Sequence, residues 1–345
     1  MDILRLTGTR RQRGQIHGEH LRDQIASVTG LWKSDIQRYT RLSPDVYIQR
    51  FLAETDFVQA IERWAPRLLD EVHGIAEGAN QPFQTILAFQ CMDEDWWFRD
   101  TVAETREHCS AFGICERGEA PLVAQNMEIH PMTDGHQVLL HLQEKDRGAF
   151  VFSFAGFIGL TGLNDRPLAV CCNTLMQLPH SRRGLPVAFV IRRLLEQADI
   201  LAAEAFLRQV EHASGQNYLL GGAAGIRDFE CSANGVTQFG AGRKRLWHTN
   251  HPLANPDPRP EKQDHFNSQQ RLDLLESRLG KGKINVDIVK SVLRQPPVCV
   301  EKDQYDDLFT SGSLVMVLSD SPELHISQGP PSSHEYRTVH FDRSD

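Results

Sequence analysis

The amino-acid sequence predicts an α+β fold with an antiparallel sheet, and three observations support this class. The first hundred residues carry apolar side chains at helical spacing. From Cys109 onward, short apolar segments separated by turn signals follow one another, as the strands of a meander do. Beyond residue 185, helical and strand-like segments are interspersed, and runs of strands bracketed by helices are typical of α+β proteins.

Residues 10–97 are expected to be mostly helical. The clearest apolar stripe recurs every three or four residues and consists of Val58, Ile61, Trp64, Leu68, Val72 and Ile75. Pro66 fits a first helical turn or a break in the helix. Gly78 and residues 80–82 interrupt the pattern before a further helical segment over 85–97.

The remaining elements follow in a mixed order. We expect strands over 110–114, 122–127, 138–142, 150–154 and 168–172, and a helical region over 185–209. Strands at 217–220, 231–238 and 245–248 precede a proline-rich loop, 252–260, which cannot be regular structure. A helix pair at 269–279 and 286–293 and strands at 313–318 and 323–327 complete the chain.

Composition excludes several classes of function. The chain is 40% hydrophobic and 24% charged, and no apolar run approaches the roughly 20 residues of a membrane helix. The N-terminus lacks a signal peptide, which predicts a cytoplasmic protein. A net charge of -8 without a basic stripe argues against nucleic acid as a partner. We therefore expect a small-molecule partner, with no membrane and no nucleic acid.

Cys109 is the first candidate for chemistry. It is one of seven cysteines without C-x-x-C spacing, a pattern that indicates neither a disulfide framework nor a zinc ribbon. A single cysteine is usually a packing residue, but Cys109 stands where the helix-rich segment gives way to the first strand. A hairpin between that strand and the next would bring Glu128 close to it.

Two later segments contribute amide side chains. Asn164 follows Gly-Leu in a sequence that is equally typical of an ordinary turn. His248, Asn250 and His251 stand at the end of a predicted strand, and two histidines three residues apart are compatible with a metal ligand pair. No third ligand occurs at a recognisable spacing, so we expect no metal and no cofactor. Asn250 is the more useful residue here, as an amide donor.

The segments around Cys109, Glu128, Asn164 and Asn250, in this order and spacing, resemble the acyl-coenzyme A:6-aminopenicillanate acyltransferase family, a group of autoproteolytic cysteine peptidases related to the choloylglycine hydrolases. Residues 8–18 and 67–79 are similar to the family's N-terminal elements, and the specific matches are 125–128, 162–164 and 248–251.

The resemblance implies a four-layer αββα sandwich of the N-terminal nucleophile hydrolase type. It also implies self-cleavage between His108 and Cys109. The chain would then consist of a helix-rich small chain, 1–108, and a catalytic large chain, 109–345, which remain partners, and a homo-oligomer is compatible with this arrangement. Two residues depart from the family pattern, since His108 replaces the usual Gly and Glu128 the usual Asp. No counterpart of the family's Arg near the last strands is evident, which leaves the charge partner of Glu128 unassigned.

The mechanism that the resemblance implies uses Cys109 twice. Its thiol attacks the His108 carbonyl, and the α-amine released by cleavage, with a reference pKa near about 8, then serves as the base. Asn250 would donate its side-chain amide, and Asn164 its side chain or a neighbouring backbone group, to the oxyanion, and Glu128 would bind the new ammonium group. The residues expected to contact substrate or support the site are Asn126, His248 and His251.

We expect hydrolysis of a small N-acyl compound, through a thioester acyl-enzyme, rather than acyl transfer, which requires a second pocket that excludes water. An alternative is an unprocessed, catalytically silent member that binds small molecules, which His108 in place of Gly favours. A thioesterase or peptidase using uncleaved Cys109 with His108 as base is disfavoured, because adjacent strand residues point to opposite faces.

Overall fold

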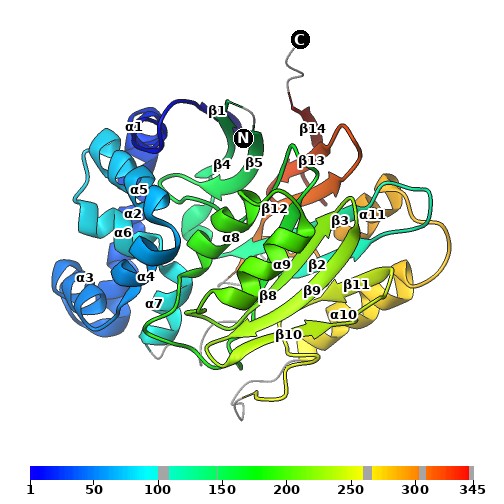
Figure 1. Ribbon diagram of the computed structural model, residues 1–345. Helices are drawn as coiled ribbons and strands as arrows, with labels where there is room; N and C mark the ends of the chain where they lie inside the picture. Colours follow the sequence, from blue (N-terminus) through cyan, green and yellow to red (C-terminus); the bar gives the residue numbers. More distant parts are fainter. Residues whose placement is uncertain (100–108, 146, 259–265, 303–307, 342–345) are drawn as a thin grey trace.

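Two β-sheets stacked face to face form the centre of the computed structural model, which describes residues 1–99, 109–145, 147–258, 266–302 and 308–341 (Figure 1). Strands β2 and β3 of one sheet contact β7 and β8 of the other. Most of the side chains between the two sheets are apolar, and the sheets bury them against each other. The predicted α+β class is confirmed.

Sheet A has eight strands within the described residues, in the order β1-β4-β5-β6-β7-β8-β9-β10, and only the β1–β4 pair is parallel. Its strands are β1 (Asp2–Leu6), β4 (Gln137–Glu144), β5 (Arg147–Phe154), β6 (Thr161–Asn164), β7 (Ala169–Thr174), β8 (Gln216–Gly222), β9 (Gly225–Ser232) and β10 (Gly235–Phe239).

Sheet B is fully antiparallel and, in the part of the chain that the structure describes, has six strands in the order β11-β2-β3-β12-β13-β14. They are β2 (Ser110–Ile114), β3 (Leu122–Ile129), β11 (Arg245–His248), β12 (Phe309–Val317), β13 (Glu323–Gln328) and β14 (Arg337–His340). Every residue of β3 is buried, as expected of a strand covered on both faces.

The predicted meander over 110–172 is wrong, because its first two strands belong to sheet B and the others to sheet A. Strand β3 pairs on its far side with β12, which lies almost 190 residues later. Short apolar segments show that strands exist, whereas the choice of partner depends on contacts between distant segments. The terminal strands β1 and β14 also escaped the sequence pattern.

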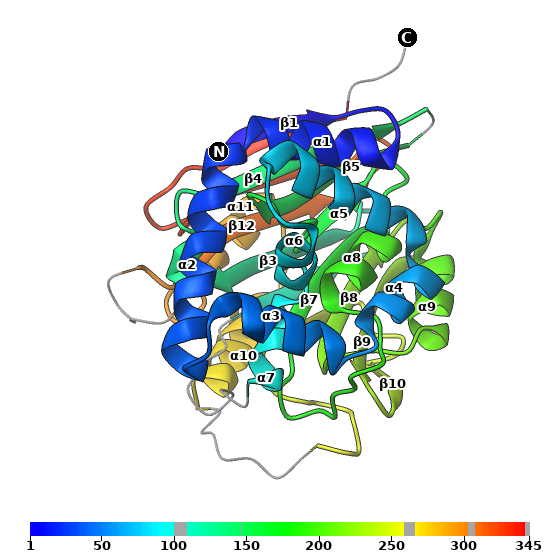
Figure 2. The ribbon, with the colours of Figure 1, turned by 90° about the vertical axis from the view of Figure 1, so that its left-hand side faces the viewer.

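Helices form the two outer layers. Helices α8 and α9 cover sheet A, whereas α10 and α11 cover sheet B, which completes an αββα sandwich (Figure 1). The N-terminal helices gather along one side of the sandwich, blue to cyan in Figure 2. The helices are α1 (Arg10–His20), α2 (Arg22–Thr40), α3 (Pro44–Ala53), α4 (Phe57–Trp64), α5 (Pro66–Ala79), α6 (Phe83–Phe89), α7 (Met92–Phe98), α8 (Val187–Leu195), α9 (Ile200–Gln209), α10 (Phe266–Leu279) and α11 (Val286–Leu293), with a short 3-10 helix at Pro131–Thr133.

Local signals explain where several helices begin. Thr9 and Gln12 form a reciprocal capping box at the start of α1, and Asp199 and Asn285 cap α9 and α11. Pro66 occupies the first turn of α5, one of the two positions that the sequence allowed. No helix among the described residues combines the length and apolar character needed to cross a bilayer.

Helices α1 and α5 pack with their backbones in contact because glycines face each other. A Cβ on Gly14 would lie 2.0 Å from the Glu71 carbonyl oxygen, and one on Gly74 would lie 2.1 Å from that of Arg11. Gly18 and Gly78 meet in the same way one turn further on. The N-terminal segments 8–18 and 67–79 are therefore this helix pair, and its glycines are required for close approach.

Replacing Gly74 by alanine is expected to lower the free energy of unfolding by at least about 2 kcal/mol, because the methyl group would have to displace backbone rather than a side chain. Gly30→Ala in α2 is the matched control, since a Cβ at this position has no neighbour within 4 Å. The higher helix propensity of alanine should raise the free energy of unfolding by up to about 1 kcal/mol. The urea unfolding midpoints of the two variants measure both effects. Equal shifts of the midpoint in Gly74→Ala and Gly30→Ala would contradict the packing argument.

Candidate active site

Cys109 immediately precedes β2, and its thiol lies in a small cavity of about 50 Å³ where both sheets meet α7 and α8. Its side chain is 7% exposed. The Cys109 Sγ atom lies 3.7 Å from the Met127 Sδ atom and 3.7 Å from the backbone oxygen of Glu128. The antiparallel register of β2 and β3 creates this contact, since it pairs Ser110 with Asn126 and so places Cys109 beside Met127.

The walls of the Cys109 cavity are mainly apolar. They include Met92, Met127, Ile129, Phe154, Phe157, Leu160, Val187, Ala188 and Ile191. Asp93, Glu128 and Thr174 are polar, and the Thr174 hydroxyl donates to the Asp93 carboxylate at 3.3 Å. Burial raises the pKa of Asp93 to about 6. A cavity of this composition suits a small apolar group whose polar end can reach one carboxyl.

Arg271 connects Cys109 to the loop after β11. Its side chain is fully buried on α10, and Nη1 donates to the Cys109 backbone oxygen at 2.5 Å and to the Ser110 hydroxyl at 3.0 Å. Nη2 donates to the Asn250 Oδ1 atom at 3.0 Å, and Nε to Asn267 at 2.8 Å. One rigid guanidinium therefore fixes the nucleophile residue and the predicted amide donor relative to each other.

Asn250 is held by hydrogen bonds on every side. Its Nδ2 atom donates to the Thr174 backbone oxygen at 3.0 Å, and its backbone N–H donates to the Ser268 hydroxyl at 2.8 Å. The Gln177 side chain donates to its carbonyl oxygen at 2.9 Å. Thr174 lines the Cys109 cavity, so the Asn250 amide contacts a residue of the cavity wall, although Asn250 is not itself a lining residue.

His248 and His251 hold this loop in place. His248 is fully buried, with Nε2 3.0 Å from the Glu230 carboxylate and Nδ1 2.9 Å from the Thr249 carbonyl oxygen. Burial disfavours the charged ring, but the hydrogen bond to Glu230 and the charges of Asp228 and Glu230 together outweigh it and raise the pKa of His248. The Nδ1 atom of His251 lies 2.7 Å from the Ser268 hydroxyl. Both histidines thus support the Asn250 loop.

Glu128 lines the Cys109 cavity and carries a carboxyl without a complete set of partners. Its Oε1 atom accepts a hydrogen bond from the Thr310 hydroxyl at 2.6 Å, whereas Oε2 is buried and has no hydrogen-bond partner among the described residues. Burial raises the pKa of Glu128 to about 8, although the Thr310 hydrogen bond and the charge of Arg271 oppose this shift. Arg271 is therefore the cationic neighbour that the sequence left unassigned.

Comparison with protein families gives a match over residues 115–310 to the model of the acyl-coenzyme A:6-aminopenicillanic acid acyl-transferase family. This region contains Glu128, Asn250 and Arg271 and covers more than half of the chain. The chain belongs to this family. The resemblance found in the sequence is thereby confirmed, although Cys109 itself precedes the matched region.

Solved structures similar to this acyl-transferase family chain include a penicillin V acylase from Agrobacterium tumefaciens, with 15% identity and a TM-score of 0.46 over 68% of this chain and 86% of that one. A variant of the conjugated bile acid hydrolase from Clostridium perfringens has 11% identity and a TM-score of 0.45, covering 68% of this chain and 97% of the hydrolase. A search of curated protein sequences finds no match.

Asn164 is not among the residues that line the Cys109 cavity, and its side chain is hydrogen-bonded elsewhere; the predicted role at the oxyanion, by its side chain or a neighbouring backbone group, stays a prediction. It stands at the end of β6 in sheet A, and its Nδ2 atom donates to the carbonyl oxygens of Leu195 and Gln197. Its Oδ1 atom accepts from the backbone N–H groups of Arg166 and Leu168. Asn164 therefore ties the end of α8 to a turn, which is the ordinary reading that its sequence allowed.

Asn126 supports the fold rather than the cavity. Its Nδ2 atom donates to the carbonyl oxygens of Leu293 and Val298, both at 2.9 Å, which anchors the end of α11 to β3. His108, the residue expected before the cleaved bond, lies outside the described residues.

Sequence reasoning missed Arg271 and Gln125 as site residues. The Gln125 side chain bonds both backbone groups of Cys172 and so links sheet B to the strand of sheet A that lines the cavity. The sequence pattern of α10 could have identified Arg271, because this residue occupies the stripe of buried positions that continues with Leu275 and Leu279. A charged residue within an apolar stripe indicates a buried partner.

Glu128→Gln is expected to flatten the pH dependence of stability. The folded carboxyl, with a pKa of about 8, keeps its proton where the unfolded one ionises near 4.5, so folding stability falls as pH rises from about 4.5 to 8. Gln cannot ionise, so the variant should avoid this loss, on the order of a few kcal/mol.

The measurement is urea unfolding at pH 5, 6.5 and 8 with the Cys109→Ala substitution present in every variant, so that no new amine can form. Glu62→Gln, at an exposed position of α4, is the control and should keep the pH profile of the parent. Parallel profiles for the parent and Glu128→Gln would show that Glu128 titrates alike in the folded and unfolded chains.

Proposed function

We propose that the protein is a self-processing N-terminal cysteine amide hydrolase that acts on small N-acyl compounds. The observation that carries this proposal is the connection of the Cys109 thiol, placed in an apolar cavity, to Asn250 through the buried guanidinium of Arg271. Membership of the acyl-transferase family supports the same chemistry.

Processing would begin at the bond between His108 and Cys109. The Cys109 thiol adds to the His108 carbonyl carbon, the peptide C–N bond breaks as its nitrogen takes up a proton, and a thioester results. Water then hydrolyses the thioester, which leaves a carboxylate on His108 and a free α-amine on Cys109. The buried Oε2 atom of Glu128, which has no partner in the described part of the chain, is the acceptor that we assign to the new ammonium group.

Catalysis would use the same residue again. The α-amine of Cys109 removes the thiol proton, and the thiolate attacks the carbonyl carbon of the substrate. Asn250 is the side chain proposed to stabilise the oxyanion: one hydrogen of its amide group donates to Thr174, and the second is left to donate to the oxyanion. The leaving amine accepts the proton, and water hydrolyses the thioester to release the acid.

The cavity indicates the class of substrate. Its apolar walls suit a small apolar acyl group, and the Asp93 carboxyl suits a hydrogen-bond donor on the substrate. Water is the proposed acceptor because acyl transfer requires a second pocket that excludes water. The thioester intermediate is common to hydrolysis and transfer, so the acceptor is an experimental question.

Intact-mass spectrometry and N-terminal sequencing of the purified protein test the proposal. We expect two fragments, one ending at His108 and the other beginning at Cys109, and a single uncleaved chain for Cys109→Ala. Cleaved wild-type protein should release the amine from N-acyl anilides of short acyl chains. An intact, inactive wild-type chain that binds these anilides would favour the silent binding protein instead.

A further inference from the structure

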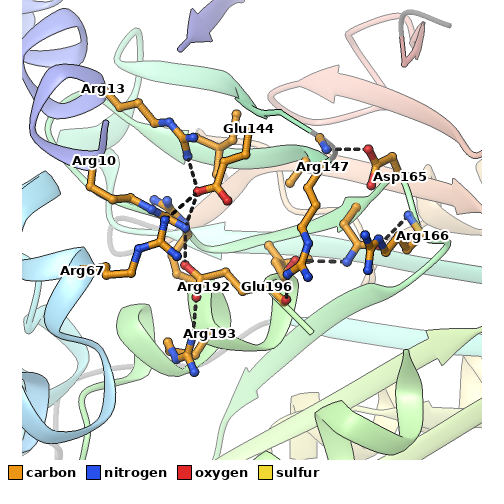
Figure 3. Close-up of a pocket in the computed structure, with 15 residues that line it drawn as sticks. Arg10, Arg13, Arg67, Glu144, Arg147, Asp165, Arg166, Arg192, Arg193 and Glu196 are labelled. Carbon is orange, nitrogen blue, oxygen red and sulfur yellow. Dashed lines mark hydrogen bonds and ion pairs between the residues drawn. The ribbon is translucent and has the colours of Figure 1, made fainter. Parts of the chain in front are cut away.

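A second cavity, of about 130 Å³, is surrounded by arginines (Figure 3). It lies between α1, the hairpin of β4 and β5, the turn after β6 and the C-terminal end of α8. Its walls contain seven arginines. Together with Glu71 behind the wall, four carboxylates face them, so the site carries an excess of three positive charges. The whole chain has a net charge of -8, so a local excess of positive charge is unusual for this protein and indicates an anion-binding site.

The floor of the cavity uses its carboxylates completely. Arg192 is fully buried and binds both oxygens of Glu71, at 2.6 and 2.9 Å. The charges of Arg192 and Arg10 overcome the effect of burial and lower the pKa of Glu71 to about 2. Arg10 also contacts Glu144 at 2.8 Å and Glu196 at 2.7 Å. These ion pairs join the N-terminal helices to sheet A and α8, and no carboxylate of the floor is left over.

Two guanidinium groups at the rim of the cavity, those of Arg147 and Arg166, are not part of this ion-pair network. Arg147 is exposed and donates to the backbone oxygen of Glu196 at 3.0 Å rather than to a carboxylate. The exposed Arg166 side chain forms no ion pair within the described residues. The carboxylate of Asp165 interacts electrostatically with both guanidinium groups, but it supplies one negative charge for two positive ones, and its Oδ2 atom also accepts from the Gly148 N–H at 2.5 Å. Three of the seven arginine charges at the cavity are therefore not balanced by its four carboxylates, and an anionic ligand would balance them.

The size and charge of this arginine-rich cavity define its ligand. A void of 130 Å³ accommodates a tetrahedral oxyanion, and an excess of three charges favours a dianion over a monocarboxylate. Arginine forks match the oxygens of phosphate in a bidentate manner. We propose that this cavity binds the phosphate group of a small molecule, with Arg147 and Arg166 as its outer ligands and Arg10 and Arg13 as the buried charges behind them.

Calorimetric titration of the purified full chain tests the site, with inorganic phosphate and glycerol phosphate as probes and chloride holding ionic strength constant. We expect saturable binding of one anion per chain. The double variant Arg147→Gln/Arg166→Gln should weaken binding at least tenfold and leave the thermal midpoint without phosphate unchanged, because both side chains are exposed. Tighter binding of glycerol phosphate than of phosphate would identify an ester as the ligand.

Arg183→Gln/Arg278→Gln is the matched control, because it removes the same charge from exposed positions outside the cavity. It should keep the affinity of the parent. The proposal is overturned if no saturable binding occurs, if both double variants lose affinity equally, or if acetate binds as tightly as phosphate. None of these measurements depends on processing or hydrolysis, so they stand apart from the proposed function.

Discussion

Replacing Cys109 by alanine is expected to reduce amide hydrolysis by at least about 10⁴-fold, because the thioester can no longer form. Cys109 is the residue whose thiol lies beside Met127 in the apolar cavity and whose carbonyl oxygen is held by Arg271. The loss should appear in kcat, measured as initial rates of amine release from an N-acyl anilide. Residual rates at the level of the uncatalysed reaction are expected.

Cys172→Ala supplies the matched control for Cys109→Ala. Cys172 is a second thiol in the same cavity, and burial raises the pKa of its thiol well above the ordinary value, so it stays protonated at neutral pH. Its removal should change kcat less than about threefold. Substantial turnover by Cys109→Ala, or a comparable loss in Cys172→Ala, would reject Cys109 as the nucleophile.

Arg271→Leu is expected to lower kcat/KM by about 10²- to 10³-fold, the range seen when a preorganised donor is lost. The substitution removes the bonds to the Cys109 oxygen, the Ser110 hydroxyl and the Asn250 side chain at once. It takes a charged donor away from three buried acceptors, so a loss of stability of about 3 kcal/mol or more should accompany it.

Two further measurements separate a positioning role of Arg271 from a general loss of structure. Arg271→Lys retains the charge but not the fork, and should recover part of kcat. In Arg271→Leu the pKa of Glu128 should rise further, because the guanidinium charge that lowers it has gone, and the pH profile of kcat/KM should shift with it. Arg278→Leu on the exposed face of the same helix should leave all three readouts unchanged. A loss of stability with unchanged kcat/KM in Arg271→Leu would contradict the role.

The two amide residues show how far local sequence reaches. Asn164 and Asn250 both follow strand-like segments and both occur in matching motifs, yet only Asn250 is linked to Cys109, through the guanidinium group of Arg271. The motif around Asn164 is equally satisfied by a turn that caps the end of α8. The two interpretations of the Asn164 motif, a structural turn and an oxyanion site, differ only in which distant element the motif contacts. A segment of four residues does not contain that information.

The sequence predicted the helices, the existence of most strands and the change from helical to strand-like pattern at Cys109. It could do so because helix caps, apolar spacing and turn residues act over a few positions. The motifs also sufficed to indicate the family. Tertiary structure alone determined three features: the sheet that each strand joins, the contact between Arg271 of α10 and Cys109, and the position of seven arginines around the second cavity. Each of these depends on contacts between residues that are far apart in the chain, and such contacts are selected by burial and charge compensation in the folded state.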